Sequence, residues 1–496
     1  MHKLNKLLSA IIIEEIIADR ITPDEPVTKI TSDSRDVIPG AMFIAVRGPV
    51  NDGHQFIESA LHAGATVIVA EQLPTCGHTG VTFVKVADSS VALGYLASAW
   101  YDNPSRKLKL IGVTGTNGKT TIATLLYRTA KLSGLKAGLL STVENRVDER
   151  IEPAINTTPS PLETNRLLND MVEAGCTFAA MEVSSHGMVQ NRTVGLHFSG
   201  GIFTNLTRDH LDYHGTFKDY LEAKKSFFDT LPSTAFALIN ADDRNGVVMV
   251  QNTMARQLTY GLSGVPDFRG RVLSSSPEGM EVELNGTVIH TPFMGRFNAY
   301  NLTAVFGAWV ALGHDEHSTA ITLSRLTPVA GRFQTFRSED GVTAVVDYAH
   351  TPDALENVLN TINEISAGKV PVFAIFGAGG DRDAGKRPLM GQVGARLADQ
   401  LVVTSDNPRN ESAEVIADEI INGALAVPNR RAEVRKVIDR ADAITETLAE
   451  APAGAIVLIA GKGHETYQEF ENRRRIHFDD REHAIEALKA RTKAMA

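Results

Sequence analysis

The sequence has few cysteines, no long apolar run and no long basic run, and each of these absences excludes a class of protein. It has 2 cysteines, Cys76 and Cys176, without metal-ligand spacing, so we expect neither a disulfide framework nor a cysteine metal site, and we predict a reducing cytoplasm. No apolar run reaches the length of a membrane span. No long basic run occurs and the net charge is −10, which argues against nucleic acid as the main partner.

The first twenty residues, MHKLNKLLSAIIIEEIIADR, have the length of a signal peptide but not its pattern. Their apolar core, Leu7–Ile13, is short, and Glu14 and Glu15 follow it without a small-residue cleavage site. We therefore predict an amphipathic first helix, no membrane insertion and a cytoplasmic protein.

Short apolar runs alternate with helical patterns in three blocks, 1–105, 106–330 and 331–496, with no internal repeat. A chain of 496 residues should form two to four domains. Strands that alternate with helices predict α/β domains with mostly parallel sheets, whose chemistry lies in loops at the carboxyl ends of the strands. We expect a site in the cleft between the second and third blocks.

A glycine-rich loop follows the apolar run that ends at Thr114 and opens a helix at Lys119-Thr120. Loop and helix N–H groups in such a layout bind phosphate oxygens. Lys119 would reach the β- and γ-phosphates of ATP, and the Thr120 hydroxyl would ligate Mg²⁺. The two glycines, Gly115 and Gly118, have two residues between them, whereas the commonest loop has four. The alternative is a strand-to-helix turn with glycines for tight packing.

Other strand ends carry groups suited to a metal bound to phosphate. Glu182 ends a buried strand, and His210 follows another, where the alternative is a structural histidine. Lys224, by its local sequence, is typical of a solvated helix face.

Two loops of the third block combine arginine with acids and tight turns. They are Gly379–Arg382 and Asp406-Asn407-Pro408-Arg409. Arginine suits a carboxylate, while Asp and Asn suit an ammonium group, so the pair indicates an amino-acid substrate. The alternative interpretation is that these two loops are ordinary surface turns with no binding role.

Many motifs, in order along nearly the whole chain, resemble those of the Mur ligases of peptidoglycan synthesis. They are Thr31-Ser32-Asp33-Ser34-Arg35, GTNGKTT (Gly115–Thr121), Asn156-Thr157-Thr158, Met181–Arg192, Thr204–Gly215, Gly295–Asn301, Asp347–Leu355, Gly377–Pro388, DNPR (Asp406–Arg409) and Ala460–Glu465. The short glycine spacing is this family's own form of the loop.

The resemblance implies three domains: an N-terminal α/β UDP-binding domain (1–105), a central P-loop-type ATPase domain with a mostly parallel sheet (106–330), and a C-terminal Rossmann-like domain for the amino acid (331–496). It implies a monomer that uses ATP and Mg²⁺. The implied activity adds meso-2,6-diaminopimelate to the D-glutamate γ-carboxylate of UDP-N-acetylmuramoyl-L-Ala-D-Glu through an acyl phosphate.

The resemblance also implies a binding or catalytic role for each residue of this sequence that matches a family motif. For the uridine end, these are Ser32, Ser34 and the backbone of Pro49–Asn51. For the muramoyl-dipeptide, they are Asn156, Thr157, Thr158, Ser184, Gln190 and Arg192. For ATP, they are Gly115, Thr116, Asn117, Gly118, Lys119, Thr120, Thr121, Asn298, Asn301, Arg332 and Asp347. For Mg²⁺, they are Thr120, Glu182, His210 and Lys224, which the resemblance implies is carried as a carbamate. Lys119, Lys224, Glu182 and His210 are the catalytic set.

For diaminopimelate, the matching positions are Arg382, Asp406, Asn407, Pro408, Arg409, Gly461 and Glu465. Diaminopimelate has a second carboxylate that lysine lacks, so Arg409 would gain a bidentate partner from one substrate and stay unpaired with the other. The alternatives are a lysine-adding or folylpolyglutamate-type ligase, a small-molecule kinase and a nucleotide-gated regulator. His350 and His464 are candidate bases for the amine.

Overall fold

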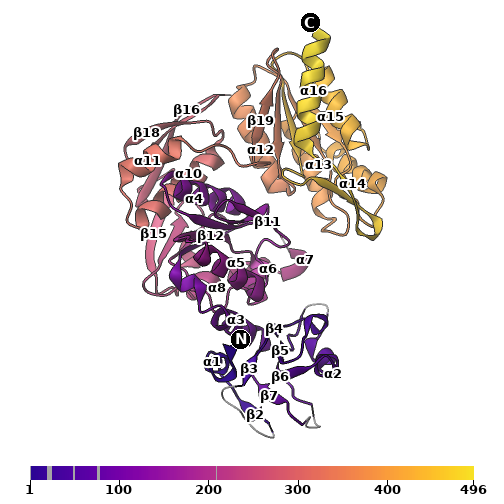
Figure 1. The fold of residues 1–496 in the computed structure, drawn as a ribbon. Coiled ribbons are helices and arrows are strands. Elements are labelled where there is room, and N and C mark those ends of the chain that lie inside the picture. Colours follow the sequence, from indigo (N-terminus) through magenta and orange to yellow (C-terminus); the bar gives the residue numbers. More distant parts are fainter. Residues whose placement is uncertain are drawn as a thin grey trace.

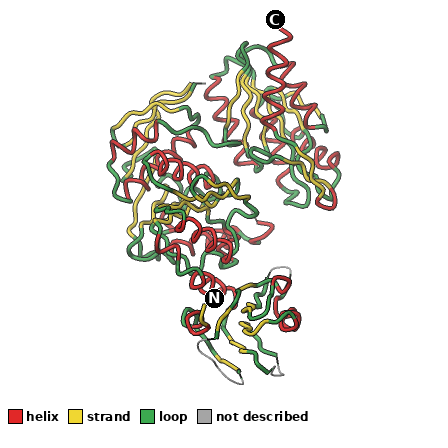
Figure 2. Tube along the Cα trace, viewed as in Figure 1, coloured by secondary structure: helices red, strands yellow, loops and turns green. Residues whose placement is uncertain are grey.

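The computed structural model describes residues 2–18, 25–48, 51–74, 79–207, 209, 211–276 and 278–495. Over these ranges the chain forms three α/β bodies, one after another, with the central body in the middle (Figure 1). Helices pack around the main sheet of each body (Figure 2). The predicted α/β class with a mostly parallel central sheet is confirmed.

The N-terminal body has a five-stranded sheet in the order β2-β7-β6-β5-β4, parallel except for β2. Its strands are β1 (His2–Lys3), β2 (Glu15–Ile17), β3 (Pro26–Val27), β4 (Ile30–Thr31), β5 (Ala41–Ile44), β6 (Ala65–Ala70) and β7 (Thr82–Lys85), and its helices are α1 (Leu4–Leu8), α2 (Ile57–His62) and α3 (Ser89–Trp100).

The prediction of one amphipathic first helix is only partly right. Helix α1 ends at Leu8, after it has buried Leu4 and Leu7, and Glu15–Ile17 pairs with β7 as a strand. β-Branched isoleucines pack well beside a neighbouring strand, and this tertiary contact outweighs the helical pattern.

The central body has an eleven-stranded sheet in the order β11-β10-β9-β12-β8-β13-β14-β15-β16-β17-β18. The strands from β9 to β16 in this order are parallel, and antiparallel hairpins extend both edges. The strands are β8 (Lys109–Thr114), β9 (Ala137–Leu140), β10 (Glu144–Val147), β11 (Arg150–Pro153), β12 (Phe178–Glu182), β13 (Gly200–Phe203), β14 (Phe236–Asn240), β15 (Arg256–Gly261), β16 (Phe268–Ser276), β17 (Gly279–Leu284) and β18 (Thr287–Thr291). The helices are α4 (Lys119–Leu132), α5 (Pro161–Glu173), α6 (Ser185–Val189), α7 (Leu211–His214), α8 (Phe217–Asp229), α9 (Gly246–Met249), α10 (Arg296–Ala311) and α11 (Glu316–Ser324).

The C-terminal body has a six-stranded sheet in the order β19-β20-β24-β21-β22-β23, parallel except for β19, and a small hairpin of β25 and β26. The strands are β19 (Gln334–Arg337), β20 (Thr343–Asp347), β21 (Val372–Phe376), β22 (Gln400–Val403), β23 (Glu433–Lys436), β24 (Ile456–Ala460), β25 (Tyr467–Phe470) and β26 (Arg474–His477). The helices are α12 (Pro352–Ser366), α13 (Lys386–Leu397), α14 (Ala413–Leu425), α15 (Arg440–Glu450) and α16 (Asp480–Met495).

A backbone contact joins the N-terminal body to the central one. A Cβ at Gly94, on α3, would lie 2.6 Å from the carbonyl oxygen of Val194, so only glycine allows this approach. The Asn191 side-chain amide donates to Ser90 Oγ at 2.8 Å beside it. The contact fixes α3 against the segment that follows Gln190. None of the described helices is long and apolar enough to cross a membrane.

One buried ion pair holds two strand ends of the C-terminal body together. Arg440 and Asp480 are fully buried, with the Arg440 Nε to Asp480 Oδ1 distance at 2.8 Å. Arg440 also donates to the carbonyl oxygens of Ser405 at 3.3 Å and Ala460 at 2.9 Å, which follow β22 and end β24. The pair therefore links the loops that carry Asp406 and Gly461.

Replacing Asp480 with alanine should lower the free energy of unfolding by about 3–5 kcal/mol, because Arg440 would stay buried without its partner. Denaturant titration followed by circular dichroism measures this change. The matched control is Glu450→Ala, which removes a carboxylate bound to Arg435 at the surface and should have little effect. Equal shifts in the two variants would contradict the expectation.

Candidate active site

The glycine-rich loop lies where β8 ends and α4 begins. Gly115 (φ +149°) and Gly118 (φ +88°) have backbone angles that favour glycine, and a Cβ at Gly115 would lie 1.8 Å from Thr204 Oγ1. No side chain caps the first turn of α4, within the described chain. Its N–H groups are therefore available to an anion, as the phosphate-loop prediction requires.

Two lysines meet at the carbonyl oxygen of Gly115. Lys119 Nζ donates to it at 2.9 Å and Lys224 Nζ at 2.8 Å. Burial lowers the pKa of Lys119. Burial, together with the charge of Lys119, lowers the pKa of Lys224 well below its ordinary value.

The interpretation of Lys224 as a residue of a solvated helix face is wrong. Its side chain is 1% exposed, and its Nζ lies 4.6 Å from the ring centroid of Tyr220, one helical turn earlier. Tyr220 and Phe227 are fully buried on α8, so the helix face that the sequence pattern assigned to solvent packs against the sheet.

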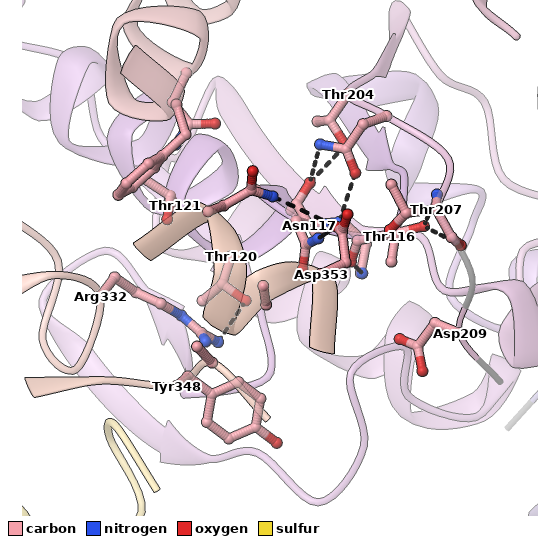
Figure 3. A pocket seen from close by; sticks show the side chains of 18 of the residues that line it. Thr116, Asn117, Thr120, Thr121, Thr204, Thr207, Asp209, Arg332, Tyr348 and Asp353 are labelled. Atoms are coloured by element: carbon pink, nitrogen blue, oxygen red, sulfur yellow. Dashed lines mark hydrogen bonds between the residues drawn. The ribbon is translucent and has the colours of Figure 1, made fainter. Parts of the chain in front are cut away.

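Glu182 and Thr120 place oxygen atoms beside this loop. Glu182 is fully buried at the end of β12, accepts from the Thr120 hydroxyl at 3.0 Å and accepts the backbone N–H of Thr142 at 2.7 Å. Arg332 Nη2 donates to the same Thr120 hydroxyl at 3.1 Å (Figure 3). Thr120 therefore contacts a residue from the central body and one from the start of the C-terminal body.

The donor set is suited to magnesium, since a carboxylate and a hydroxyl are hard oxygen ligands. Glu182 and Thr120 are adjacent, and Lys224 contacts the same loop as an amine at the Gly115 carbonyl. His210, the other predicted ligand, lies outside the described residues. In the described parts of the chain, no group of three or more His, Cys, Asp or Glu could hold a metal ion.

Asp347 fixes the turn that carries Arg332. Its carboxylate, at the end of β20, accepts the N–H groups of Phe333 and Ala349, each at 2.7 Å. Phe333 has a left-handed φ of +48°. The Arg332 guanidinium lies 4.3 Å from the Tyr348 ring centroid, and its Nε is buried without a hydrogen-bond partner among the described residues. Burial raises the pKa of Asp347, against the opposing charge of Arg332.

A cavity of about 900 Å³ lies between the central and C-terminal bodies. Several predicted residues line it: Thr116, Asn117, Gly118, Lys119, Thr120, Thr121, Asn156, Thr157, Thr158, Glu182, Ser184, Gln190, Arg192, Lys224, Asn301, Arg332, Asp347 and Arg382. Asn117 bridges the two bodies by donating to Asp353 at 3.4 Å (Figure 3).

Of two predicted ATP contacts on α10, Asn301 lines the cavity and Asn298 lies behind it. Asn298 receives a hydrogen bond from Asn301 at 3.1 Å, both on α10. A Cβ at Gly118 would lie 2.8 Å from Asn301 Oδ1, so α10 packs directly on the loop.

The residues predicted for the muramoyl-dipeptide form one hydrogen-bond network. The Thr158 hydroxyl donates to the Glu182 carbonyl at 2.9 Å and accepts the Ser184 N–H at 2.9 Å. Arg192 Nη1 donates to the Thr158 carbonyl at 2.6 Å, and Arg192 Nη2 donates to Gln190 Oε1 at 2.6 Å. Asn156 and Thr157 line the cavity beside them.

The residues predicted for the uridine end lie apart from this cavity. Ser32 is exposed, and Ser34 begins a short helical turn after β4 in the N-terminal body. Asn51 accepts the Gly48 N–H through its carbonyl at 2.9 Å. Pro49, in the same predicted segment, lies outside the described residues.

A second polar cluster follows β22 and β24 in the C-terminal body. Lys462 is fully buried, and its Nζ donates to Asn407 Oδ1 at 2.9 Å and to Glu465 Oε2 at 3.2 Å. Asn407 Nδ2 donates to the same Glu465 oxygen at 2.9 Å. Asp406 Oδ1 lies 3.9 Å from Lys462 Nζ, and a Cβ at Gly461 would lie 2.4 Å from Asp406 Oδ2.

Pro408 and Arg409 continue this cluster beside the loop at 379–382. A Cβ at Gly380 would lie 1.9 Å from the Pro408 carbonyl oxygen, so the two loops pack backbone to backbone. Arg409 Nη1 donates to the Gly380 carbonyl at 2.7 Å. Arg382 is exposed and lines the cavity.

The two candidate bases are both neutral at physiological pH. Burial, with the charge of Lys386, lowers the pKa of His350 to about 4, and burial with the charge of Arg332 lowers that of His464 to about 3. An imidazole with such a pKa is a weak base toward an ammonium group with a pKa near 10, taken as roughly that of lysine.

The sequence reasoning missed Lys462, Tyr348 and Thr204. Lys462 lies between two glycines in the motif Ala460–Glu465, and this position is the signal that could have marked it. Tyr348 follows Asp347 and supports Arg332. Thr204 donates to the Asn117 carbonyl at 2.6 Å and so holds the loop from β13.

A glycine loop at the end of a parallel strand, with buried lysines and a carboxylate around it, defines a phosphate-binding α/β enzyme of several domains. Family models match the chain in three parts: the Mur ligase family catalytic domain at residues 26–101, the Mur ligase middle domain at 113–309, and the Mur ligase glutamate ligase domain at 331–463. The chain belongs to the Mur ligase family.

Similar proteins have related sequences over nearly their full length. The UDP-N-acetylmuramoyl-L-alanyl-D-glutamate–2,6-diaminopimelate ligase of Phocaeicola vulgatus is 51% identical over 97% of this chain and 98% of its own. The ligase of the same name from Parabacteroides distasonis is 53% identical, over 92% and 93%. A solved structure with that ligase name is 33% identical, covers 99% of both chains and has a TM-score of 0.69.

Lys224 should react with CO₂, because its neutral amine can attack the carbon and lose a proton to give a carbamate. With ¹³C-bicarbonate at pH 8, a carbamate carbon signal should appear in the NMR spectrum. It should fade as the pH falls through the lowered pKa of Lys224, since protonation removes the nucleophile.

The control is the neighbouring Lys225, whose Nζ lies 2.7 Å from Asp229 Oδ2 and not at the Gly115 carbonyl. Lys224→Arg should abolish the signal and Lys225→Arg should keep it. A signal that survives Lys224→Arg would show that this lysine is not the site.

Proposed function

We propose that this protein is an ATP-dependent ligase that joins the D-glutamate γ-carboxylate of UDP-N-acetylmuramoyl-L-Ala-D-Glu to an amino group of meso-2,6-diaminopimelate, in cytoplasmic synthesis of peptidoglycan precursors. The observation that carries the proposal is the pair of sites on facing bodies. A phosphate loop with two lysines lies on one side, and a cluster of Asp406, Asn407, Glu465 and Arg409 lies on the other. The names of relatives about half identical support the same substrates.

The first step is attack of the γ-carboxylate on the γ-phosphate of ATP, which gives an acyl phosphate and ADP. Both reactants are anions, so the loop must supply positive charge. Lys119 now donates to the loop's own carbonyls, and its ammonium would turn to the phosphates when they bind. Arg332, between Thr120 and Tyr348, adds a second cation.

Thr120, Glu182 and a Lys224 carbamate are the described groups that would hold Mg²⁺, and His210 is the fourth proposed ligand. Magnesium supplies charge neutralisation for the transferring phosphoryl group when bound. Carbamate formation would replace the neutral Lys224 amine with an anion, which would help to balance the positive charge of Lys119, Arg332 and the metal.

The second step is attack of a neutral amine of the diamino acid on the acyl phosphate, followed by loss of phosphate. Asp406 and Glu465 would bind an ammonium group of the substrate, with Asn407 and the buried Lys462 fixing their positions. Arg409 would bind the second carboxylate, which only diaminopimelate offers.

The UDP end would lie against Ser32, Ser34 and Asn51, and the muramoyl-dipeptide against the network of Thr158, Gln190 and Arg192. The contact at Gly94 supports this placement, because it holds the N-terminal body against the segment after Gln190. The substrate would then extend from that body toward the phosphate loop.

Phosphate release from ATP and UDP-N-acetylmuramoyl-L-Ala-D-Glu should require meso-diaminopimelate, and mass spectrometry should show the tripeptide product. L-Lysine, assayed in parallel, should be poorer by about 100-fold or more in kcat/KM, because lysine has no second carboxylate to accept from the Nη2 group of Arg409. Release with lysine alone would leave an amide ligase but reject this role of Arg409. Release that needs no amine would favour a small-molecule kinase.

Gly461→Ala should lower kcat/KM for the diamino acid by about 100-fold, because the new Cβ would displace Asp406 by an ångström or more. The KM for ATP should change little. Initial rates at varied diamino acid measure the loss in kcat/KM, and initial rates at varied ATP measure the KM for ATP.

Gly454→Ala is the control, since Gly454 also has a positive φ, of +79°, at the other end of β24, but its Cβ would meet only Val370 at 3.5 Å. The same loss in both variants would mean that backbone strain, not Asp406, is responsible.

A further inference from the structure

The hairpin of β25 and β26 places one carboxylate between two arginines. Glu469 Oε1 lies 3.3 Å from Arg409 Nε. Glu469 Oε2 accepts from Arg475 Nε at 2.8 Å and lies 2.7 Å from Arg475 Nη2. Each oxygen of this carboxylate is therefore directed at a different guanidinium, and the bond to Arg475 is the shorter.

Arg475 is held in this position from two sides. It is the cross-strand partner of Glu469 in the register of the hairpin, so the two side chains lie on the same face. Its guanidinium carbon also lies 4.0 Å from the ring centroid of Tyr467. The side chain is nevertheless 56% exposed, so the core does not depend on it.

The Arg409 guanidinium is held through two of its nitrogens. Its Nε lies against Glu469, and its Nη1 donates to the Gly380 carbonyl at 2.7 Å, while the backbone N–H of Arg409 donates to the Glu469 carbonyl at 3.1 Å. Its Nη2 has no hydrogen-bond partner among the described residues. The edge of the guanidinium that carries Nη2 is the one available to a bound carboxylate.

The charge of Glu469 bears directly on what Arg409 can bind. Burial would raise the pKa of Glu469, but the hydrogen bond from Arg475 and the charges of Arg475 and Arg409 lower it, so the group is an anion. An anion beside Arg409 cancels its charge and repels an incoming carboxylate. Arg475 offsets this, since the three groups together carry one positive charge.

We propose that Arg475 is a specificity-determining positioning residue, which holds Glu469 and neutralises it so that Arg409 keeps its charge and one open edge for the second carboxylate of the diamino acid. The inference rests on the proposed function and extends its amino-acid site to the β25–β26 hairpin. Nothing in the DNPR motif itself points to Arg475, which lies more than sixty residues later in the sequence.

The test compares Arg475→Gln with Arg474→Gln in the amine-dependent phosphate release assay. Both remove one positive charge from β26, but Arg474 lies 5.0 Å from the Phe470 ring centroid and has no carboxylate partner among the described residues. Arg475→Gln should raise the KM for meso-diaminopimelate about tenfold, as loss of a close charge in a partly buried site does. The kcat, the KM for ATP and the KM for L-lysine should change less than about twofold, because the effect is confined to the second carboxylate.

A second comparison uses Glu469→Gln as the background. Without the anion there is nothing for Arg475 to neutralise, so Arg475→Gln should then change the KM for diaminopimelate by less than about twofold. A full tenfold effect in that background would overturn the proposal. So would equal changes in Arg475→Gln and Arg474→Gln, or a parallel rise in the KM for lysine.

The wild-type enzyme and the Arg475→Gln variant test the proposed function and the role of Arg475 separately. If the wild-type enzyme shows no response to either diamino acid, the proposed function is wrong and this inference falls with it. If the wild-type enzyme uses diaminopimelate and Arg475→Gln behaves like Arg474→Gln, only the role of Arg475 is rejected.

Discussion

Two lysine side chains share the carbonyl oxygen of Gly115, and much of the site depends on that crowding. Lys119 and Lys224 come from different helices, α4 and α8. Lys224 is 1% exposed, and Lys119 is partly buried at the cavity wall. Placing two like charges in a buried site is costly, and loss of a proton from Lys224 relieves it. The same packing that closes the core around Tyr220 therefore produces a reactive amine beside a phosphate loop.

The second organising element is the turn between the central and C-terminal bodies. Asp347 accepts two backbone N–H groups there, and this holds Phe333 in a left-handed conformation and directs Arg332 at Thr120. The phosphate loop and the first strand of the C-terminal sheet are thus joined through one guanidinium. Parallel strands bring their carboxyl ends to one edge, so residues far apart in sequence meet across the cavity.

Much of the fold followed from local patterns. Thr351 caps α12 through a hydrogen bond from the Ala354 N–H, and Pro352 begins that helix, which are positions that local sequence favours for threonine and proline. Local sequence patterns gave wrong predictions where a contact with another part of the chain determined the secondary structure or the burial of a side chain. Glu15–Ile17 became a strand because β7 pairs with it, and Lys224 turned inward because Tyr220, one turn away, is in the core.

The sequence by itself determined the chemistry available at each strand end: a glycine loop with a lysine, a buried carboxylate, and loops rich in arginine and acids. These follow from short-range patterns, since turns, caps and apolar runs are local. Only the tertiary structure decided which charges meet. Lys462 is buried among Asn407 and Glu465, and Arg475 is placed on Glu469, because pairing across strands and burial depend on residues distant in sequence.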